Sequence, residues 1–345
     1  MDAFITNIAI EKLKPNPYRN LETYPWNEAK IADLQRSYAE VGMWEGVIAR
    51  PVGDHFEIPF AHHRVEAARR NGVKEIPTIV RSLTNEQMIR MMAHENSEDY
   101  STDFVVQLNT WEGGIQYFGE ISQELAKKPE PLEIARFLGM TRLDDKGKQG
   151  DRLDVAAEAC NAAHALIQSG HLSRSDLIGL NVSAARELTQ AILSQMQLVD
   201  KLAQIQKAPA SSVAKAKGYV ATAGKHAAEG VRKGEVPTKR IRMEVSANAF
   251  SNAAKAAKDD KPLPLLTAFA DALCRHLSKT LTDDYAAEKL GEIAKALSSI
   301  TLEDDHAALR RVQFELGEIG KRADRWAKRI TPDKVTSLKA LEDKS

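Results

Sequence analysis

The chain has 345 residues and a mass of 38.1 kDa, more than one hydrophobic core usually organises, so two or three domains are expected. Hydrophobic residues make up 43% and charged residues 28% of the chain, which excludes a protein too polar to fold. Lys and Arg number 48, as do Asp and Glu, so the total charge of zero by itself argues against a nucleic-acid binder.

The cysteines and the apolar runs of the sequence indicate the cellular compartment of the protein. Cys160 and Cys274 lie far apart and lack metal-ligand spacing, so neither a disulfide framework nor a structural zinc site is indicated. The first ten residues lack the basic start and apolar stretch of a signal peptide, and no run approaches the length of a membrane span. We therefore expect a cytoplasmic protein.

The first hundred residues alternate strand-like and helical patterns. Short apolar runs predict strands over Ile5–Ile10, Val47–Val52, His55–Ile58 and Ile76–Val80. Helical spacing predicts a helix over Asn27–Val41 that stops at Gly42, and another over His63–Arg70. The sequence thus predicts a small α+β domain over residues 1–100.

After Tyr100 the pattern is helical, and no further strand is predicted. Apolar residues recur every three or four positions through Phe104–Leu125 and again from Leu132. Glycines and a proline, which often interrupt helices, predict a flexible segment further on; they are Gly218, Gly224, Gly230, Gly234 and Pro237. Pro262 and Pro264 mark another break, so a C-terminal helical unit is expected over residues 263–345.

Positive charge is concentrated in one stretch. Residues 1–100 carry 12 basic and 15 acidic side chains, and residues 101–200 carry 9 and 14. The segment Lys201–Arg242, here called the basic strip, carries 10 basic and 2 acidic side chains, and residues 243–345 carry 17 of each. Such a strip suits phosphate binding; the alternative is a solvated Ala/Lys-rich helix or linker. We predict a basic flexible linker over residues 201–262.

Apolar residues near the C-terminus repeat every seven positions. One row is Leu302, Leu309, Leu316, Ala323 and Ile330, and a second is Val312, Ile319 and Trp326. This spacing is typical of an a/d seam, so the C-terminal unit is expected to dimerise. The alternative is a helix packed against its own chain.

One motif in the first domain is chemically unusual. Pro59-Phe60-Ala61-His62-His63-Arg64 follows a predicted strand and opens a helix. A helix N-terminus favours anions, and an arginine adds a bidentate phosphate donor, so this turn predicts a phosphate site. The alternative is a solvated first turn.

The order of motifs resembles the N-terminal domain of ParB-type partition proteins, which has the ParB/sulfiredoxin fold. The matching elements are Leu13-Lys14-Pro15-Asn16-Pro17-Tyr18-Arg19, Gly42–Arg50, the Ala61–Arg64 turn, Gly72–Pro77 and His94–Asn96. In that family a GERR turn and an ENxxR segment cradle the triphosphate of CTP with a magnesium ion. The resemblance covers roughly residues 5–100. It implies an α+β N-terminal ParB/sulfiredoxin-like domain followed by mainly α-helical domains.

Mapped residue by residue, the family glycine is Ala61, the glutamate is His62, and the two arginines are His63 and Arg64. Glu95 and Asn96 match the metal-binding and phosphate-side pair, whereas Asp99 replaces the final arginine. The resemblance thus implies nucleotide contacts from Ala61, His62, His63, Arg64, Gly46, Val47 and Asn96. It also implies that Glu95 holds Mg²⁺ and that Glu95 and His63 are the candidate catalytic residues.

The same turn is similar to that of sulfiredoxins, which ends Cys-His-Arg. His62 stands at the cysteine position, so sulfinic-acid reduction is excluded. Other relatives of the fold use ATP or cleave nucleic acid. An ATP-dependent phosphotransferase or a metal-dependent nuclease therefore remains an alternative, as does a domain that only scaffolds partners.

In ParB proteins a helical domain with a helix-turn-helix follows, and Pro131–Thr141 resembles its first helix and turn. The recognition helix would begin at Thr141, although Arg142–Gly150 reads more like a loop and the helix resumes near Asp151. The resemblance implies a helical, helix-turn-helix-like DNA-binding domain over residues 101–200. The expected DNA contacts are Thr141, Arg142, Lys146, Lys148 and Arg152, and, in the basic strip, Lys215, Lys217, Arg232, Lys233, Lys239, Arg240 and Arg242.

The leading hypothesis is a CTP-dependent, ParB-like DNA-binding protein that acts in plasmid, phage or chromosome partition or regulation. It would be a cytoplasmic, nucleoid-associated homodimer that works with a partition ATPase. Whether it hydrolyses the nucleotide, and whether the nucleotide is CTP or another NTP, is left open.

Overall fold

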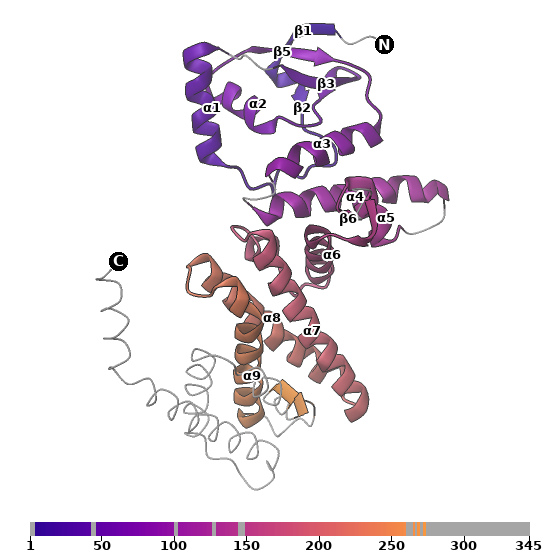
Figure 1. The fold of residues 1–345 in the computed structure, drawn as a ribbon, viewed down its shortest axis with the longest axis vertical. Helices are drawn as coiled ribbons and strands as arrows, with labels where there is room; N and C mark the ends of the chain where they lie inside the picture. The colour runs from indigo at the N-terminus through magenta and orange to yellow at the C-terminus, as the bar shows by residue number, and fades with distance from the viewer. Residues whose placement is uncertain are drawn as a thin grey trace, which may run out of the picture. The chain divides into compact units, whose positions relative to one another are not determined.

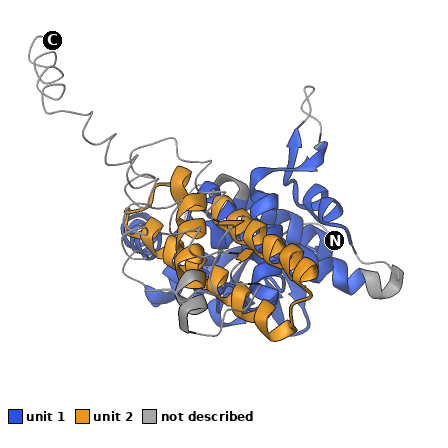
Figure 2. Ribbon diagram, turned by 90° about the horizontal axis from the view of Figure 1, so that it is seen from below, with its two compact units in different colours: residues 1–186 blue, residues 187–345 orange. Residues whose placement is uncertain are grey.

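The computed structural model describes residues 4–42, 46–99, 103–125, 129–143, 149–259 and five residues between 265 and 273. The chain divides into two compact units, residues 1–186 and residues 187–345 (Figure 2). The predicted a/d seam, Cys274, Lys146 and Lys148 lie outside the described residues.

The first unit contains a five-stranded sheet in the order β1-β5-β3-β4-β2 (Figure 1). Its strands are β1 (Phe4–Ala9), β2 (Leu13–Lys14), β3 (Val47–Val52), β4 (His55–Glu57) and β5 (Glu75–Val80). β1 lies at one edge of the sheet and pairs antiparallel with β5, which pairs parallel with the central strand β3. β4 pairs antiparallel with β3 and parallel with β2. The four predicted strands are confirmed, and the two-residue β2 is too short to give a sequence pattern.

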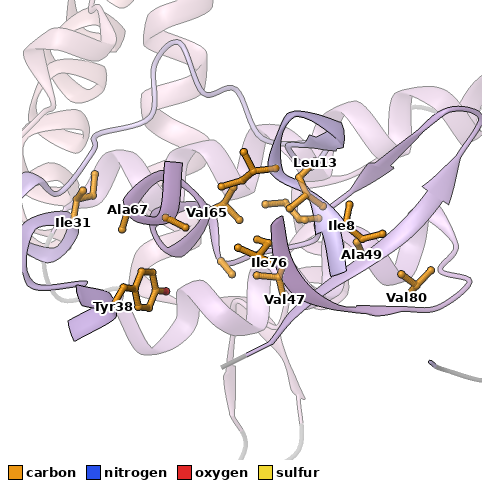
Figure 3. Close-up of a cluster of buried hydrophobic side chains, with 14 residues drawn as sticks. Ile8, Leu13, Ile31, Tyr38, Val47, Ala49, Val65, Ala67, Ile76 and Val80 are labelled. Carbon is orange, nitrogen blue, oxygen red and sulfur yellow. The ribbon is translucent and has the colours of Figure 1, made fainter. Parts of the chain in front are cut away.

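Helices α1 (Glu28–Val41) and α2 (His62–Arg70) build the core of this domain with the sheet. The side chain of Asn27 caps α1 by accepting the Lys30 N–H at 2.9 Å, and Gly42 ends the helix with a φ of 75°. Figure 3 shows side chains from both helices, such as Ile31 and Val65, gathered with Val47 and Ile76 of the sheet. Burying one such side chain contributes about 1.5–3 kcal/mol. Because Ala61 and Val65 both belong to this cluster, their burial holds the first turn of α2 against the sheet.

The rest of the first unit is mainly helical, as predicted. It contains α3 (Asn85–Asp99), α4 (Phe104–Leu125), α5 (Pro131–Leu138), β6 (Thr141–Leu143), β7 (Gln149–Leu153), α6 (Val155–Gln168) and the short 3-10 helices η1 (Ile10–Lys12) and η2 (Arg174–Asp176). Helix α7 (Val182–Gln206) begins in this unit and continues into the second. None of the described helices is long and apolar enough to cross a bilayer.

The structure corrects the prediction for the segment after α5. Helix α5 forms as expected, with a capping box between Glu130 and Glu133 and a left-handed Gly139 at its end. No helix begins at Thr141; instead β6 and β7 pair as an antiparallel hairpin, and the next helix begins at Val155 with Asp154 as its cap. The pairing of β6 with β7 also contradicts the expectation of no strand after Tyr100.

The structure also corrects the prediction of a flexible linker over residues 201–262. This segment contains the end of α7, α8 (Ala210–Arg232), η3 (Thr238–Arg240) and α9 (Ile241–Asp259). The glycines inside it serve close packing: a Cβ on Gly224 would lie 2.4 Å from the Ile192 Cδ1 atom, and one on Gly230 would lie 2.6 Å from the Val236 Cγ2 atom. The boundary placed at residue 200 falls inside the continuous helix α7.

Candidate functional site

The predicted phosphate turn forms a strained helix start. Ala61 has a φ of 70° and a ψ of 25°, in the left-handed region, where an L-residue costs roughly 1–2 kcal/mol. Its methyl group belongs to the hydrophobic cluster, and its carbonyl accepts the Val65 N–H at 3.1 Å. Alanine has no side-chain acceptor for the N–H groups of the first helical turn. Backbone strain of this kind clusters at ligand sites.

His62 is the first residue of α2 and is only 3% exposed. The Asn16 N–H donates to its Nε2 at 3.3 Å, and the Arg19 Nη1 lies 3.1 Å from its Nδ1. Burial, followed by the charges of Arg19 and His63, lowers the pKa of His62 well below 6.5. A neutral imidazole has one acceptor nitrogen, so only one of these two N–H groups donates to the ring in a given tautomer, and proton uptake would remove that acceptor. His62 is therefore a neutral hydrogen-bond acceptor.

Arg19 lies at the centre of the site, although sequence reasoning did not select it. Its side chain is 2% exposed; Nη2 donates to the Asn96 Oδ1 at 3.0 Å, and the guanidinium lies 4.9 Å from the centre of the Tyr24 ring. The carboxylate of Glu95 is 3.8 Å from Nη2 and is itself 32% exposed. A buried cation needs close compensation, and this contact is too long for a strong ion pair. The Arg19 guanidinium is therefore only weakly compensated by the Glu95 carboxylate.

Asn96 and Glu95 come from the last two turns of α3 and face the same guanidinium. Asn96 is 2% exposed, and its Nδ2 donates to the Thr110 Oγ1 of α4 at 2.9 Å. Asn96, expected beside the phosphates, is thus committed to Arg19 and Thr110. Arg19 contacts both His62 of the turn and the Glu95 carboxylate of α3.

His63 is partly buried within an aromatic group. Its ring centre lies 5.5 Å from that of Tyr24 and 5.4 Å from that of Trp26, and its Nε2 accepts the Asn27 N–H at 3.2 Å. A general base needs a nitrogen with a free lone pair, and the lone pair of Nε2 already accepts this hydrogen bond. Arg64, in the third position of α2, is half-buried.

Asn16 is a second residue that sequence reasoning missed. It is fully buried, and its Nδ2 donates to the carbonyls of Pro59 and Met88, both at 3.0 Å. Its Oδ1 accepts the Tyr18 N–H at 3.0 Å. Asn16 therefore ties the strand before α2 to α3. The available signal was the Pro-Asn-Pro-Tyr-Arg segment, whose polar residues are unusual beside a short strand.

Gly46 and Val47, expected near the base, lie at the start of β3. The Val47 side chain is fully buried in the hydrophobic cluster, so only its backbone can contact a ligand. A small pocket beside α2 is lined by residues that include Lys14, Trp26, His62, Val65 and Arg69. Its volume of about 60 Å³ is enough for a few water-sized groups.

Metal ligands are sparse. Within the described ranges, no three His, Cys, Asp or Glu side chains gather closely enough to hold a metal ion. A single carboxylate such as that of Glu95 would be compatible with Mg²⁺, which usually binds one or two carboxylates and takes its other ligands from phosphates and water.

The predicted DNA contacts of the hairpin are only partly accessible. Thr141 is 5% exposed, so its side chain does not reach a groove. Arg142 is exposed, but its Nη2 donates to the Glu158 Oε1 at 2.9 Å. The other Glu158 oxygen accepts the Arg186 Nε at 2.7 Å. Arg152, on β7, is exposed.

The predicted contacts of the basic strip lie in the second unit on α8, η3 and α9, and several of them are paired with carboxylates. Lys217 lies 2.8 Å from Asp200 and Lys233 lies 2.7 Å from Glu229, and Arg242 pairs with Glu187. Lys215, Arg232 and Lys239 are exposed, and Arg240 is half-buried. Exposed pairs of this kind are weak, so these cations can exchange a carboxylate for a phosphate.

A family model for the ParB N-terminal domain matches residues 2–97, which contain the complete five-stranded sheet, the α2 turn and the Glu95-Asn96 pair. Residues 2–97 are thus similar to the ParB N-terminal domain. The resemblance noted from the motif order is thereby confirmed, and so is the α+β class of this domain with a mainly helical remainder.

Several of the curated relatives are named as chromosome-partitioning proteins. The chain is 23% identical over 126 residues to the chromosome-partitioning protein Spo0J of Thermus thermophilus, a match that covers 36% of this chain and 46% of the relative. It is 24% identical over 208 residues to the stage 0 sporulation protein J of Bacillus subtilis, covering 58% of this chain and 67% of that one. The chain thus spans less than half the length of the Thermus relative.

Two solved structures, a chromosome-partitioning protein and a sulfiredoxin, have low overall similarity to the chain. A C-terminally truncated ParB from Caulobacter crescentus, complexed with CTP-γ-S, is 18% identical with a TM-score of 0.26, covering 54% of this chain and 92% of that one. Sulfiredoxin from Arabidopsis thaliana is 21% identical with a TM-score of 0.23, covering 26% of this chain and 97% of that one.

Proposed function

We propose that this protein is a partition protein that binds a nucleoside triphosphate at the N-terminus of α2 and binds DNA through its helical part. The ParB N-terminal domain supports the assignment to partition. CTP is the first nucleotide to test because the family resemblance implies it. In this proposal the protein works in the cytoplasm on the nucleoid, as a homodimer with a partition ATPase.

The observation that carries the nucleotide site is the buried Arg19 beside a helix start without a side-chain cap. The guanidinium is 2% exposed and has its nearest carboxylate, that of Glu95, at 3.8 Å. The α2 N-terminus adds a positive dipole end, and Ala61 supplies no competing acceptor. A triphosphate would provide the negative charge that this arrangement lacks, and Arg64 on the same turn would provide a further donor.

Mg²⁺ would be held by Glu95 together with phosphate oxygens. The metal supplies charge neutralisation at the phosphates when it is bound. Glu95 suits this role because it is partly exposed and its contact with Arg19 is long.

Equilibrium dialysis of labelled CTP, ATP, GTP and UTP, with Mg²⁺ and with or without DNA, tests the site. We expect binding of at least one nucleotide and a 10- to 150-fold loss of affinity for Arg64→Ala, about the effect of one charged hydrogen bond. Arg81→Ala is the matched control, since Arg81 is exposed and lies after β5. The proposal fails if no nucleotide binds, or if both variants bind as the parent does.

DNA binding is proposed to depend on the basic strip, including Lys215, Lys217, Arg232, Lys233, Lys239, Arg240 and Arg242. Arg142 and Arg152 of the hairpin would add backbone contacts; Lys146 and Lys148 complete this set in the sequence. Affinity for duplex DNA should fall steeply with salt, with a slope of about 0.9 per phosphate contacted. Binding that is insensitive to salt would remove this part of the proposal.

The described contacts do not favour the nuclease and phosphotransferase alternatives. His63, the expected general base, accepts the Asn27 N–H, and His62 is held neutral between two donors. Incubation with plasmid DNA and Mg²⁺ or Mn²⁺ would reverse this preference if nicking occurred and Glu95→Ala abolished it.

A further inference from the structure

A chain of hydrogen bonds leads from the proposed nucleotide site to α4. Arg19 donates to Asn96 at 3.0 Å, Asn96 donates to Thr110 at 2.9 Å, and Thr110 donates to the Val106 carbonyl at 3.1 Å. Asn96 is 2% exposed and Thr110 is fully buried. Helix α3, which carries Asn96, packs against α4, which carries Thr110 (Figure 1).

The direction of every bond in this chain is fixed by chemistry. A guanidinium can only donate, so the Asn96 carbonyl oxygen must face Arg19. The Asn96 amide group must then face Thr110, whose oxygen accepts while its hydrogen is given to the Val106 carbonyl. The Thr110 hydroxyl thus both holds the Asn96 amide in place and is itself held by the backbone of α4.

We propose that Thr110 is a positioning residue for the nucleotide site: it orients Asn96, and Asn96 orients the Arg19 guanidinium. Without the threonine oxygen, the buried Asn96 amide N–H loses its acceptor, and this unsatisfied donor favours rotation or displacement of the Asn96 side chain. Rotation would turn N–H groups toward Arg19, where only an acceptor is tolerated. Arg19 would then leave the position between His62 and Glu95 from which it meets phosphate.

The inference rests on the proposed nucleotide site and adds a residue outside the family motifs. It predicts that the packing of α4 and nucleotide binding are coupled, because the Thr110 hydroxyl bonds both the Val106 carbonyl of α4 and the Asn96 side chain beside the site. By reciprocity, a nucleotide that engages Arg19 must also alter the stability of the α4 segment around Thr110.

The test compares nucleotide affinity in the full chain for Thr110→Val and Thr78→Val. Both threonines are fully buried, and both hydroxyls donate to a local carbonyl, that of Ile76 in the case of Thr78. Only Thr110 also accepts a bond from Asn96. We expect Thr110→Val to weaken CTP binding about 3- to 10-fold, the effect of one net hydrogen bond, and Thr78→Val to leave it unchanged. Thr110→Ser, which keeps the hydroxyl, should restore it.

A double-mutant cycle with Arg19→Met separates positioning from general damage. If Thr110 acts through Arg19, then Thr110→Val has no further effect on affinity once Arg19 is replaced. Equal losses for both threonine variants, or an undiminished effect in the Arg19→Met background, would overturn the inference and leave the nucleotide site intact. Absence of nucleotide binding by the parent protein would instead overturn the proposed function, and the inference with it.

Discussion

The buried His62 makes a quantitative prediction about pH and stability. Burial and the neighbouring charges of Arg19 and His63 lower its pKa well below 6.5 in the folded chain. In the unfolded chain the ring regains its ordinary pKa and takes up a proton as the pH falls below 6.5. The folded state does not take up this proton, so unfolding becomes more favourable below pH 6.5, and above it the contribution vanishes.

The magnitude follows from this linkage. One extra proton bound by the unfolded state costs about 1.4 kcal/mol per pH unit, so this site should remove about 1.4 kcal/mol of stability between pH 7.5 and pH 5.5. Replacement by glutamine, His62→Gln, keeps a hydrogen-bonding side chain that does not titrate. The variant should be less stable than the parent at pH 7.5, and the gap should shrink by about 1.4 kcal/mol at pH 5.5.

Urea unfolding followed by tryptophan fluorescence measures this difference, since Trp26 and Trp111 both lie in the first unit. Thr78→Val, a buried substitution that does not change a titrating group, is the control and should run parallel to the parent at all pH values. Parallel pH profiles for His62→Gln and the parent would refute the reasoning, because they would mean that His62 takes up its proton equally in both states.

Three further predictions concern packing, connectivity and charge. Gly224→Ala should destabilise the chain by about 1–3 kcal/mol because the new Cβ would collide with the Ile192 side chain. Gly218→Ala, whose new Cβ would have no atom within 4 Å, should instead stabilise α8 by about 0.5–1 kcal/mol. Thermal unfolding of both variants distinguishes these outcomes, and equal shifts in melting temperature would contradict the packing described. Asn16→Ala should cost about 2–4 kcal/mol in urea unfolding, since it leaves the Pro59 and Met88 carbonyls and the Tyr18 N–H without their partner; a loss below 1 kcal/mol would show that water replaces it. Replacing both Lys215 and Lys239 by alanine should reduce the slope of log affinity for DNA against log salt by up to about 2; an unchanged slope would show that these side chains touch no phosphate.

The sequence was sufficient for the architecture of the first domain because its patterns are local. Apolar alternation placed β1, β3, β4 and β5, and Asn27 and Gly42 marked the ends of α1. It also singled out the Ala61–Arg64 turn, where the structure has its strained helix start. Glu95 was placed near this turn by the family pattern, and the contact of both with Arg19 agrees with that expectation.

The remainder depended on contacts between distant residues, which composition does not reveal. Arg19 and Asn16 are buried by partners 43 to 77 positions away, so their own segment can mark them as unusual but does not specify what they pack against. Gly224 and Gly230 signalled flexibility when considered alone, yet each accommodates a side chain from another part of the second unit. The pairing of β6 with β7 was missed because their sequences, Thr-Arg-Leu and Gln-Gly-Asp-Arg-Leu, are mostly polar and lack the apolar run of the predicted strands.

The account depends on an anion site at the first turn of α2, and amide hydrogen exchange tests this most directly. Addition of CTP and Mg²⁺, or of the nucleotide that dialysis identifies, should slow exchange at the backbone amides of residues 62–65, and this protection should be lost in Arg64→Ala. Protection confined to other segments, with residues 62–65 exchanging at the same rate in the presence and absence of nucleotide, would contradict the account.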